Sequence, residues 1–435
     1  MVKRNLLALS LIFLMIFSGC KLFIKPDINT KPADLGKLLS GAELTLAKAL
    51  GGYDVAMTTA MWLQQISGVG GQPQARYYYL YQPKEVNNLW SDLYAEVMKS
   101  CDSIIKLSDE RNAKYYKGVA KILYALALGN TTDLFGDVPY SQAFRSDSPA
   151  YDPQQQVYQG IFKMLDEGIA ILSASDPGDV ELKGDIIYNW DVNKWIKAAY
   201  TLKARYLMHL TKVQQVDYQT VINYLNNGIS SLDEDMKVVF YVNNTTPPIY
   251  EYLHKNTGIG NNITYQNILV DRNDPRITAL GYNGFWARQD AYFPFVQYTE
   301  ALFLKSEAYW RLGDSVDAKE NLKLGVQASM KKYYIDDNQW YADYCSYVDS
   351  LPMDSLIHEI AVQDYIDLLY HPEAFVDWRR LDYPVLKPVV GDKLPRRFPY
   401  CQVELDRNSN TPRDVNIFTP VWWDIQDSTQ TFVLR

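Results

Sequence analysis

Apolar side chains recur every three or four residues over most of the chain, which is the spacing of one face of an α-helix. The most regular stripe covers residues 86–107 and consists of Val86, Leu89, Trp90, Leu93, Tyr94, Val97, Met98, Cys101, Ile104 and Ile105. Further stripes predict helices over residues 38–61, 193–211, 218–229, 297–312, 315–330 and 353–370. The pattern therefore predicts a mainly α-helical protein.

Residues 114–172 predict two helices joined by an ordered connection. The apolar stripe of the first helix consists of Tyr115, Val119, Ile122, Leu123 and Leu126. Gly129 and Asn130 are residue types that commonly end helices, so we expect the first helix to end there. The loop that follows, residues 131–144, carries several apolar side chains, which predicts that it packs against the helices.

The second helix of this pair has a recognisable start. Asp152 suits the N-cap position, Pro153 suits the first helical position, and Gln155 is placed for a capping box. The apolar face of this helix consists of Val157, Tyr158, Ile161, Phe162, Leu165 and Ile169. Nothing in this pair of helices points to catalysis.

The chain has 435 residues, more than the roughly 250–300 that one compact core usually serves. Several helix pairs of similar size account for this length, because such units can stack on their neighbours. One pair, joined at Gly313, resembles a tetratricopeptide repeat in its small residues Ala301 and Ala308. We therefore predict a tetratricopeptide-like helical superhelix as the scaffold, with long irregular loops over residues 237–298 and 371–435.

Residues 62–83 combine glycines with aromatic side chains. Gly68, Gly70 and Gly71 disfavour helix and predict a flexible loop. They lack the lysine and the spacing of a phosphate-binding loop. The aromatic residues of this segment are Trp62, Tyr77, Tyr78, Tyr79 and Tyr81. The chain contains 34 tyrosines, and tyrosine suits surfaces that are partly apolar and partly wet, so we expect a recognition function in addition to helix packing.

The N-terminus predicts export and lipid anchoring. Lys3 and Arg4 precede an apolar run, residues 6–17, that is too short to span a bilayer, and a small-residue cleavage site ends at Cys20. We therefore expect residues 1–19 to be a lipoprotein signal peptide and Cys20 to be acylated. Residues 20–37 would form a tether and residues 38–435 the folded protein.

The formal net charge is −8, and it becomes −10 when residues 1–19, which contain two basic residues and no acid, are removed. An acidic protein without a basic tract is a poor candidate for binding nucleic acid. Cys101 continues an apolar stripe and is expected in the core. A disulfide between Cys345 and Cys401 is an open alternative, because the sequence does not show whether the two residues meet.

Sequence patterns of catalysis and metal binding are absent. Residues 358–362 read HEIAV, so the second histidine of a zinc protease motif is replaced by Val362. The four histidines have no metal-ligand spacing, and neither CxxC nor GxSxG occurs. A glycosidase carboxylate pair stays open, because its members are distant in sequence. We expect no catalytic residues, no metal and no cofactor.

Four separated segments and one short motif resemble the SusD/RagB family of outer-membrane nutrient-binding lipoproteins. The first segment reads TDLFGDVPYSQAF followed by YDPQQQVYQGIFKMLDEGI. The others are residues 292–308, with Glu307 and Ala308 in the expected place, residues 375–384, and residues 395–408. The motif Asp274-Pro275-Arg276 also fits. The resemblance covers most of the chain after residue 20.

This resemblance implies a tetratricopeptide-like fold and a role in nutrient uptake. Such a protein would be held on the outer membrane, at the cell surface, through its N-terminal lipid anchor. It would capture a glycan or oligosaccharide and close over a SusC-like TonB-dependent transporter. Trp378, Arg379 and Arg380 would pin the C-terminal segment to the scaffold instead of holding ligand.

A sugar site needs aromatic faces for C–H patches, together with fixed hydrogen-bonding groups for hydroxyls, on loops held by a rigid frame. Two segments meet this description, and the resembling family likewise builds its site from loops after the early helices and a mid-chain loop. In residues 62–81 the candidates are Trp62, Gln65, Arg76 and Tyr78. In residues 271–292 they are Tyr282, Asn283, Trp286 and Arg288. The alternative for each aromatic residue is that it seals its loop onto the scaffold.

Two other classes of function stay open at this point. A helical-repeat lipoprotein for envelope assembly would need the repeats but not the aromatic loops. A surface glycan hydrolase would need turnover of a polysaccharide. A nutrient-binding lipoprotein accounts for both the repeats and the loops.

Overall fold

The centre of the fold is the pair of helices α6 (Lys114–Phe135) and α7 (Gln154–Ser173), which pack along each other. The computed structural model describes residues 33–240, 245–255, 258–281 and 284–425. Gly168 allows the close approach of the pair, because a Cβ atom there would lie 2.7 Å from Ile122 and 3.1 Å from the Gly118 carbonyl oxygen. The predicted helix pair is confirmed, with two corrections at its connection.

The first correction concerns the end of α6. The helix does not stop at Gly129 and Asn130 but continues to Phe135, and Gly136 ends it with a φ of +80°. Gly129 serves packing, because a Cβ atom there would lie 2.1 Å from the hydroxyl oxygen of Tyr206. Asn130 stays in the helix and donates its side-chain amide to the carbonyl of Leu126.

The second correction concerns the start of α7. Asp152 does not cap the helix, because its carboxylate accepts the backbone N–H groups of Tyr140 and Ser141, each at 2.8 Å. The N–H of Gln154 donates instead to Asp137, a residue of the connecting loop. The loop is thus folded onto the helix it precedes, and its apolar residues Leu134, Phe135 and Val138 are buried as expected.

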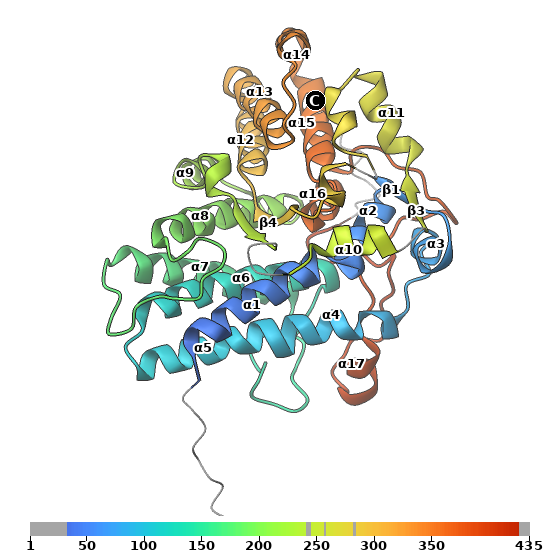
Figure 1. Ribbon diagram of the computed structural model, residues 1–435. Helices are drawn as coiled ribbons and strands as arrows, with labels where there is room; N and C mark the ends of the chain where they lie inside the picture. Colours follow the sequence, from blue (N-terminus) through green and yellow to red (C-terminus); the bar gives the residue numbers. More distant parts are fainter. Residues whose placement is uncertain (1–32, 241–244, 256–257, 282–283, 426–435) are drawn as a thin grey trace, which may run out of the picture. The chain divides into compact units, whose positions relative to one another are not determined.

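The predicted superhelix is confirmed: α6, α7, α8 (Val192–His209), α9 (Tyr218–Asn226), α12 (Tyr298–Leu312) and α13 (Ser315–Lys332) pack each on the next (Figure 1). Two further helices, α14 (Asn338–Ser350) and α15 (Met353–Asp367), both pack on α13, and α15 also packs on α12. At the turn between α12 and α13, Gly313 has a φ of +81° and Asp314 accepts the first N–H groups of α13. Two small apolar clusters accompany the large core, one among α8, α9 and α12 and one among α12, α13, α14 and α15.

The first part of the described chain covers α6 on another side. α1 (Leu35–Leu50) packs on α5 (Lys99–Glu110), and α5 packs on α6. The predicted interruption at Gly51 and Gly52 is present, and a π-helical turn, η1 (Tyr53–Met57), and α2 (Thr58–Trp62) follow it. The predicted helix 86–107 is present as α4 (Asn87–Ser91), the π-helical η3 (Asp92–Met98) and α5.

The segments predicted as irregular contain more structure than their sequences indicated. Residues 62–83 are not a plain flexible loop, because Gly71, at a φ of +58°, starts a helix. The elements in the three segments are β1 (Ile66–Gly68), α3 (Gly71–Tyr77), β2 (Met236–Val239), α10 (Pro248–Lys255), β3 (Ile259–Asn261), α11 (Ile263–Asp271), η7 (Pro275–Thr278), η8 (Phe285–Ala287), β4 (Tyr292–Val296), α16 (Pro372–Leu381) and α17 (Gln402–Arg407). β1 pairs antiparallel with β3, and β2 pairs antiparallel with β4. These short pairings attach the loops to one another.

The state of the cysteines and the length of the helices answer two further questions that the sequence raised. Cys101, Cys345 and Cys401 are all free thiols, so the open alternative of a Cys345–Cys401 disulfide is not realised. In the described part of the chain, every helix is too short or too polar to cross a bilayer.

Candidate functional site

The first predicted segment is organised around a buried tryptophan. Trp62, at the end of α2, is 1% exposed, and its indole N–H donates to the carbonyl of Arg76 at 3.0 Å. Its ring meets Tyr81, Phe375 and Phe398 edge to face. Trp62 therefore joins this segment to the C-terminal part of the scaffold.

Arg76 is equally enclosed and fully partnered. Its guanidinium lies 3.6 Å from the ring centre of Tyr81, pairs with Asp54 at 3.3 Å and with Glu85 at 3.4 Å, and donates to Thr58 at 2.7 Å. Gln65 is buried too and donates its side-chain amide to the carbonyl of Tyr365 at 2.8 Å. Arg76 thus uses its hydrogen-bonding capacity inside the protein, whereas the side-chain oxygen of Gln65 is buried without a hydrogen-bond partner among the described residues.

Tyr78 differs from its neighbours, because 40% of it is exposed. It follows α3, and its ring lies 5.8 Å from that of Tyr77, whose hydroxyl accepts the side-chain amide of Asn262. Val69 and Leu80, which follow β1 and α3, and Ile263 at the start of α11 are exposed as well. This side of the loop is thus apolar and open to solvent.

The second predicted segment has a buried base and an exposed rim. Trp286 in η8 is 4% exposed and packs edge to face on Tyr292 and Tyr333. Arg288, two residues further on, is exposed and forms a two-pronged pair with Asp290 at 2.8 and 2.5 Å. Trp286 therefore supports a rim on which a fixed donor–acceptor pair faces solvent.

A residue that the sequence did not indicate completes this rim. Tyr334 is 75% exposed, directly after α13, and the Arg288 guanidinium lies 6.0 Å from its ring centre. Its φ of +59° is unusual for an aromatic residue, and such conformations concentrate at functional sites. The only sequence signal was a pair of tyrosines just beyond the predicted end of the 315–330 helix. We refer to Arg288, Asp290 and Tyr334 as the Arg288 rim.

Helix α10 lies between the second segment and η1, the turn that precedes the first segment. It packs against η1 on one side, where Tyr252 stacks on Tyr53 at 4.4 Å, and against η8 on the other. Arg76 lies 4.8 Å from the ring centre of the same Tyr53. Figure 1 shows α10 with α3, β1 and β3 to one side and β4 to the other. The helix thus packs against η8 of the second segment and against η1, the turn that precedes the first segment.

The predicted site residues differ in burial. Trp62, Gln65, Arg76 and Trp286 are buried among protein groups. Tyr78 and Arg288 remain accessible. Three candidates, Cys20, Tyr282 and Asn283, lie outside the described residues.

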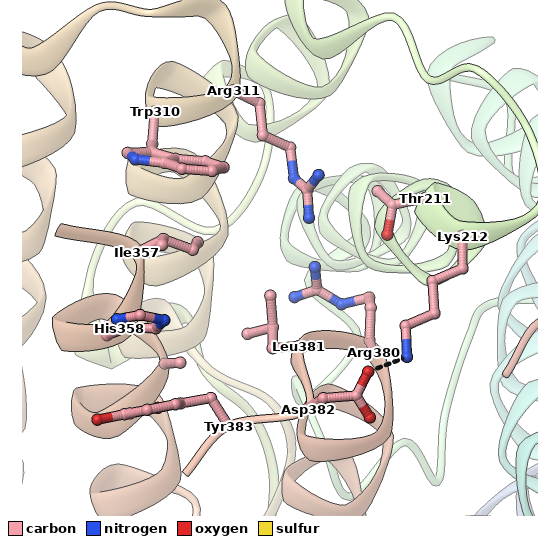
Figure 2. Close-up of a pocket in the computed structure, with 11 residues that line it drawn as sticks. Thr211, Lys212, Trp310, Arg311, Ile357, His358, Arg380, Leu381, Asp382 and Tyr383 are labelled. Carbon is pink, nitrogen blue, oxygen red and sulfur yellow. Dashed lines mark hydrogen bonds and ion pairs between the residues drawn. The ribbon is translucent and has the colours of Figure 1, made fainter. Parts of the chain in front are cut away.

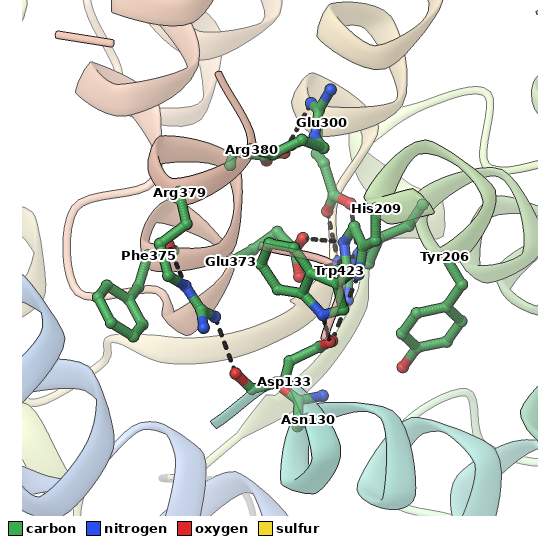
Figure 3. Close-up of polar contacts among 12 residues, drawn as sticks. Asn130, Asp133, Tyr206, His209, Glu300, Glu373, Phe375, Arg379, Arg380 and Trp423 are labelled. Carbon is green, nitrogen blue, oxygen red and sulfur yellow. Dashed lines mark hydrogen bonds and ion pairs between the residues drawn. The ribbon is translucent and has the colours of Figure 1, made fainter. Parts of the chain in front are cut away.

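A buried polar network ties the C-terminal segment to the scaffold (Figure 3). Asp133 of α6 accepts the hydroxyl of Tyr158 at 2.5 Å and the indole N–H of Trp423 at 2.8 Å. Arg379 donates to the backbone carbonyls of Asp133 and Arg396, as the proposed pinning role requires. Arg379 is therefore structural.

The same network contains two histidines whose pKa values shift in opposite directions. His209 lies between Glu373, at 2.5 Å, and Asp133, at 3.3 Å. Burial opposes its protonation, but the two carboxylates outweigh burial and raise the pKa of His209 to about 9. Burial and the charge of Arg205 lower the pKa of His371 to about 3. Burial opposes ionisation of Glu373, but His209 and Arg205 lower its pKa to about 2.

A cavity of about 220 Å³ lies beside this network, between α12, α15 and α16 (Figure 2). Figure 2 shows the guanidinium groups of Arg311 and Arg380 facing each other across it. Both contact Glu307, at 2.7 and 2.6 Å, and Lys212 pairs with Asp382 at 2.6 Å. Because these cations already have carboxylate partners, the cavity offers little charge to a ligand.

Catalysis gains no support from the geometry. Within the described residues, no group of three or more histidine, cysteine or acidic side chains could hold a metal ion. The strongly perturbed ionisable groups named above lie inside the scaffold and partner one another, instead of lining an accessible cleft.

Comparison with known proteins places the chain in a family. Residues 28–290 and 282–401 match the SusD-like family described as "Starch-binding associating with outer membrane". Among curated proteins no sequence matches.

Solved structures agree in fold. A chitin-binding protein is 24% identical with a TM-score of 0.75, over 90% of this chain and 100% of that one. A chitin-binding SusD homolog from Flavobacterium johnsoniae is 20% identical with a TM-score of 0.76, over 89% and 99%. A SusD/RagB family protein from Bacteroides thetaiotaomicron is 22% identical with a TM-score of 0.73, over 90% and 99%. With a family match that spans most of its length, and the helical architecture described above, the chain belongs to the SusD-like family of outer-membrane-associated binding proteins.

Proposed function

We propose that this protein is a lipid-anchored surface protein that binds glycan and delivers it to a SusC-like TonB-dependent transporter. The observation that carries the proposal is the Arg288 rim. It sets an exposed tyrosine ring beside a fixed arginine–aspartate pair, on a loop supported by buried aromatic residues. Sugars need this combination of an apolar face and oriented hydrogen-bonding groups.

The comparisons support the same ligand class. The family description names starch, and two of the similar structures are of chitin-binding proteins. Tyr78, beyond α10, offers a second exposed ring with which an extended oligosaccharide could make contact. We therefore propose an oligosaccharide that lies along α10, between Tyr78 and the Arg288 rim.

Replacing Tyr334 by alanine is expected to weaken oligosaccharide binding about tenfold, because stacking on one ring contributes about 1–1.5 kcal/mol. The variant should unfold at the temperature of the wild type, since Tyr334 is 75% exposed. Isothermal titration calorimetry with maltooligosaccharides and chitooligosaccharides measures the affinity and shows which of the two sugars is bound.

Trp190→Ala is the matched control, because Trp190 is also exposed, at 53%, but lies outside both segments. Its affinity should equal that of the wild type. Unchanged affinity in Tyr334→Ala, with binding retained, would place the glycan elsewhere. Absence of any oligosaccharide binding by the wild type would contradict glycan capture itself.

The anchor and the transporter can be tested together. Wild-type protein is expected in the membrane fraction, and its affinity purification from detergent extracts should recover a TonB-dependent barrel. Cys20→Ala should leave the protein in the aqueous fraction, because stable anchoring needs the acyl chains. Membrane retention of Cys20→Ala would contradict the anchor, and a wild-type purification without any barrel protein would contradict the transporter.

A further inference from the structure

A second accessible cavity lies between helix α14 and the turn that joins α11 to η7, and its lining includes no residue of the Arg288 rim. Its volume of about 550 Å³ falls in the range of small-molecule sites. It is lined by Asp271, Arg272, Asn273, Trp340, Asp343, Tyr344, Tyr347 and Glu359. None of these residues belongs to the site proposed above.

One wall of the cavity is an aromatic stripe on α14. Trp340, Tyr344 and Tyr347 are spaced by four and three residues, so they share one face of the helix. The rings of Trp340 and Tyr344 stack at 5.2 Å with an interplanar angle of 10°, and the Tyr347 ring lies 6.2 Å from Tyr344. The stripe presents aromatic surface to the cavity along more than one turn of the helix.

The stripe is held rigidly at one end and open at the other. The indole N–H of Trp340 donates to the carbonyl of Arg272 at 3.1 Å, and the Tyr344 hydroxyl donates to Glu359 at 3.3 Å. Tyr344 is 7% exposed and belongs to the apolar cluster that α12, α13, α14 and α15 form together. Tyr347 is 46% exposed, so core packing explains Tyr344 but not Tyr347.

The polar groups of the cavity carry an excess of negative charge. Arg272 pairs with Glu359 at 3.3 Å, which leaves two further carboxylates on the rim, Asp271 and Asp343. Both are exposed, and neither has a cationic partner among the residues that the structure describes. Asp343 only accepts the side-chain amide of Gln339, at 3.0 Å. The cavity therefore attracts a cation.

An organic cation fits this site better than a metal ion does. The carboxylates do not converge into a metal-binding group in the described part of the chain. Aromatic faces, in contrast, attract ammonium groups and pack against C–H surfaces. The Arg272 guanidinium and the Asn273 amide add donors for hydroxyl groups. The cavity thus combines an aromatic face, donors for hydroxyl groups and negative charge. A sugar ring that bears a protonated amine complements all three features.

We propose that this cavity is a separate binding site for an amino sugar with a free, protonated amine, such as a glucosamine unit of an oligosaccharide. The ring lies against Tyr347, the ammonium group faces Asp271 and Asp343, and hydroxyl groups meet Arg272 and Asn273. The site differs from the Arg288 rim in its residues and in its preference for positive charge. It does not require glycan binding at that rim.

Calorimetry with a glucosamine oligosaccharide, at low salt and at a pH where its amines are protonated, tests the site. Tyr347→Ala should weaken binding about tenfold. Asp343→Asn should weaken it severalfold and should reduce its dependence on salt, because one charge is removed while the shape is kept. The N-acetylated oligosaccharide, which has no charge, should lose nothing from Asp343→Asn.

Trp190→Ala is the matched control, because Trp190 is 53% exposed and lies outside both proposed sites, and it should leave binding at this cavity intact. A lysine peptide serves as the competing ligand. Equal affinity for that peptide and for the glucosamine oligosaccharide would contradict sugar recognition. Wild-type affinity in both Tyr347→Ala and Asp343→Asn, with unchanged melting temperatures, would overturn the site, as would absence of binding by the wild type.

Discussion

Replacing Asp133 by alanine is expected to lower the free energy of unfolding by about 3–5 kcal/mol, the cost of breaking a buried ionic group. Asp133 is 3% exposed and accepts hydrogen bonds from Tyr158 and Trp423, while His209 lies 3.3 Å away. Its removal leaves two buried donors, the Tyr158 hydroxyl and the Trp423 indole N–H, without an acceptor, and each unpaired donor costs about 1–3 kcal/mol. His209 also loses one of the two carboxylates that hold its charge.

Equilibrium unfolding in urea, followed by circular dichroism, measures this loss. Asp147→Ala is the control, because Asp147 is exposed, and its effect should stay within about 0.5 kcal/mol. A loss below about 1 kcal/mol in Asp133→Ala would show that the network around it contributes little to stability.

Acid is expected to destabilise the protein through His371, starting near pH 6.5. In the fold, Nδ1 of His371 accepts the N–H of Glu373 at 3.1 Å, and Nε2 lies 3.0 Å from the carbonyl oxygen of Pro294. This arrangement uses the neutral ring, and burial lowers the pKa to about 3. The unfolded chain binds the proton first, so the stabilisation is present above pH 6.5 and is lost as the pH falls toward 3.

Glu373 and His209 stabilise the folded state over different pH ranges. The pKa of Glu373, about 2, gives a contribution that is present above pH 4.5 and is lost as the pH falls toward 2. The pKa of His209, about 9, gives a contribution that is present below pH 6.5 and is lost as the pH rises through 9. Stability should therefore be highest near neutral pH.

His371→Asn isolates the first of these windows. Asparagine still suits the N-cap of α16 but does not titrate. Between pH 6.5 and 4.5 the wild type should lose about 2 kcal/mol more than the variant, because each pH unit below the unfolded pKa corresponds to about 1.4 kcal/mol and the unfolded histidine is already half protonated at pH 6.5. Unfolding curves measured for both proteins across this range should diverge, and parallel curves would contradict a neutral His371.

The helical scaffold could be predicted because long apolar stripes record burial directly. The predicted helix ends failed where a residue type is explained by tertiary packing and not by the local backbone. Gly129 was interpreted as a helix end, but its missing side chain makes room for Tyr206, which lies 77 residues away along the chain. Asp152 is a residue type that often caps helices, but its carboxylate accepts the backbone N–H groups of Tyr140 and Ser141 in the preceding loop instead.

The candidate site was only partly predictable for a related reason. The sequence shows that Trp62, Trp286 and Tyr78 are aromatic, but it does not show on which side of a loop each ring lies. The structure buries both tryptophans and exposes the tyrosine. Tyr334 was missed because it comes from a third segment, and only the fold brings it to Arg288.

The hydrogen bond from Trp423 to Asp133 joins residues 290 positions apart in the sequence, and this separation affects when the protein can finish folding. During synthesis the helices α6 and α7 are made early, yet a partner of their buried carboxylate is supplied by almost the last residue that the structure describes. Contacts of such long range slow folding, because the intervening chain must be ordered before they form. Although they are made early, α6 and α7 are thus among the last parts to reach their final packing, so the chain stays incompletely folded until Trp423 has been made.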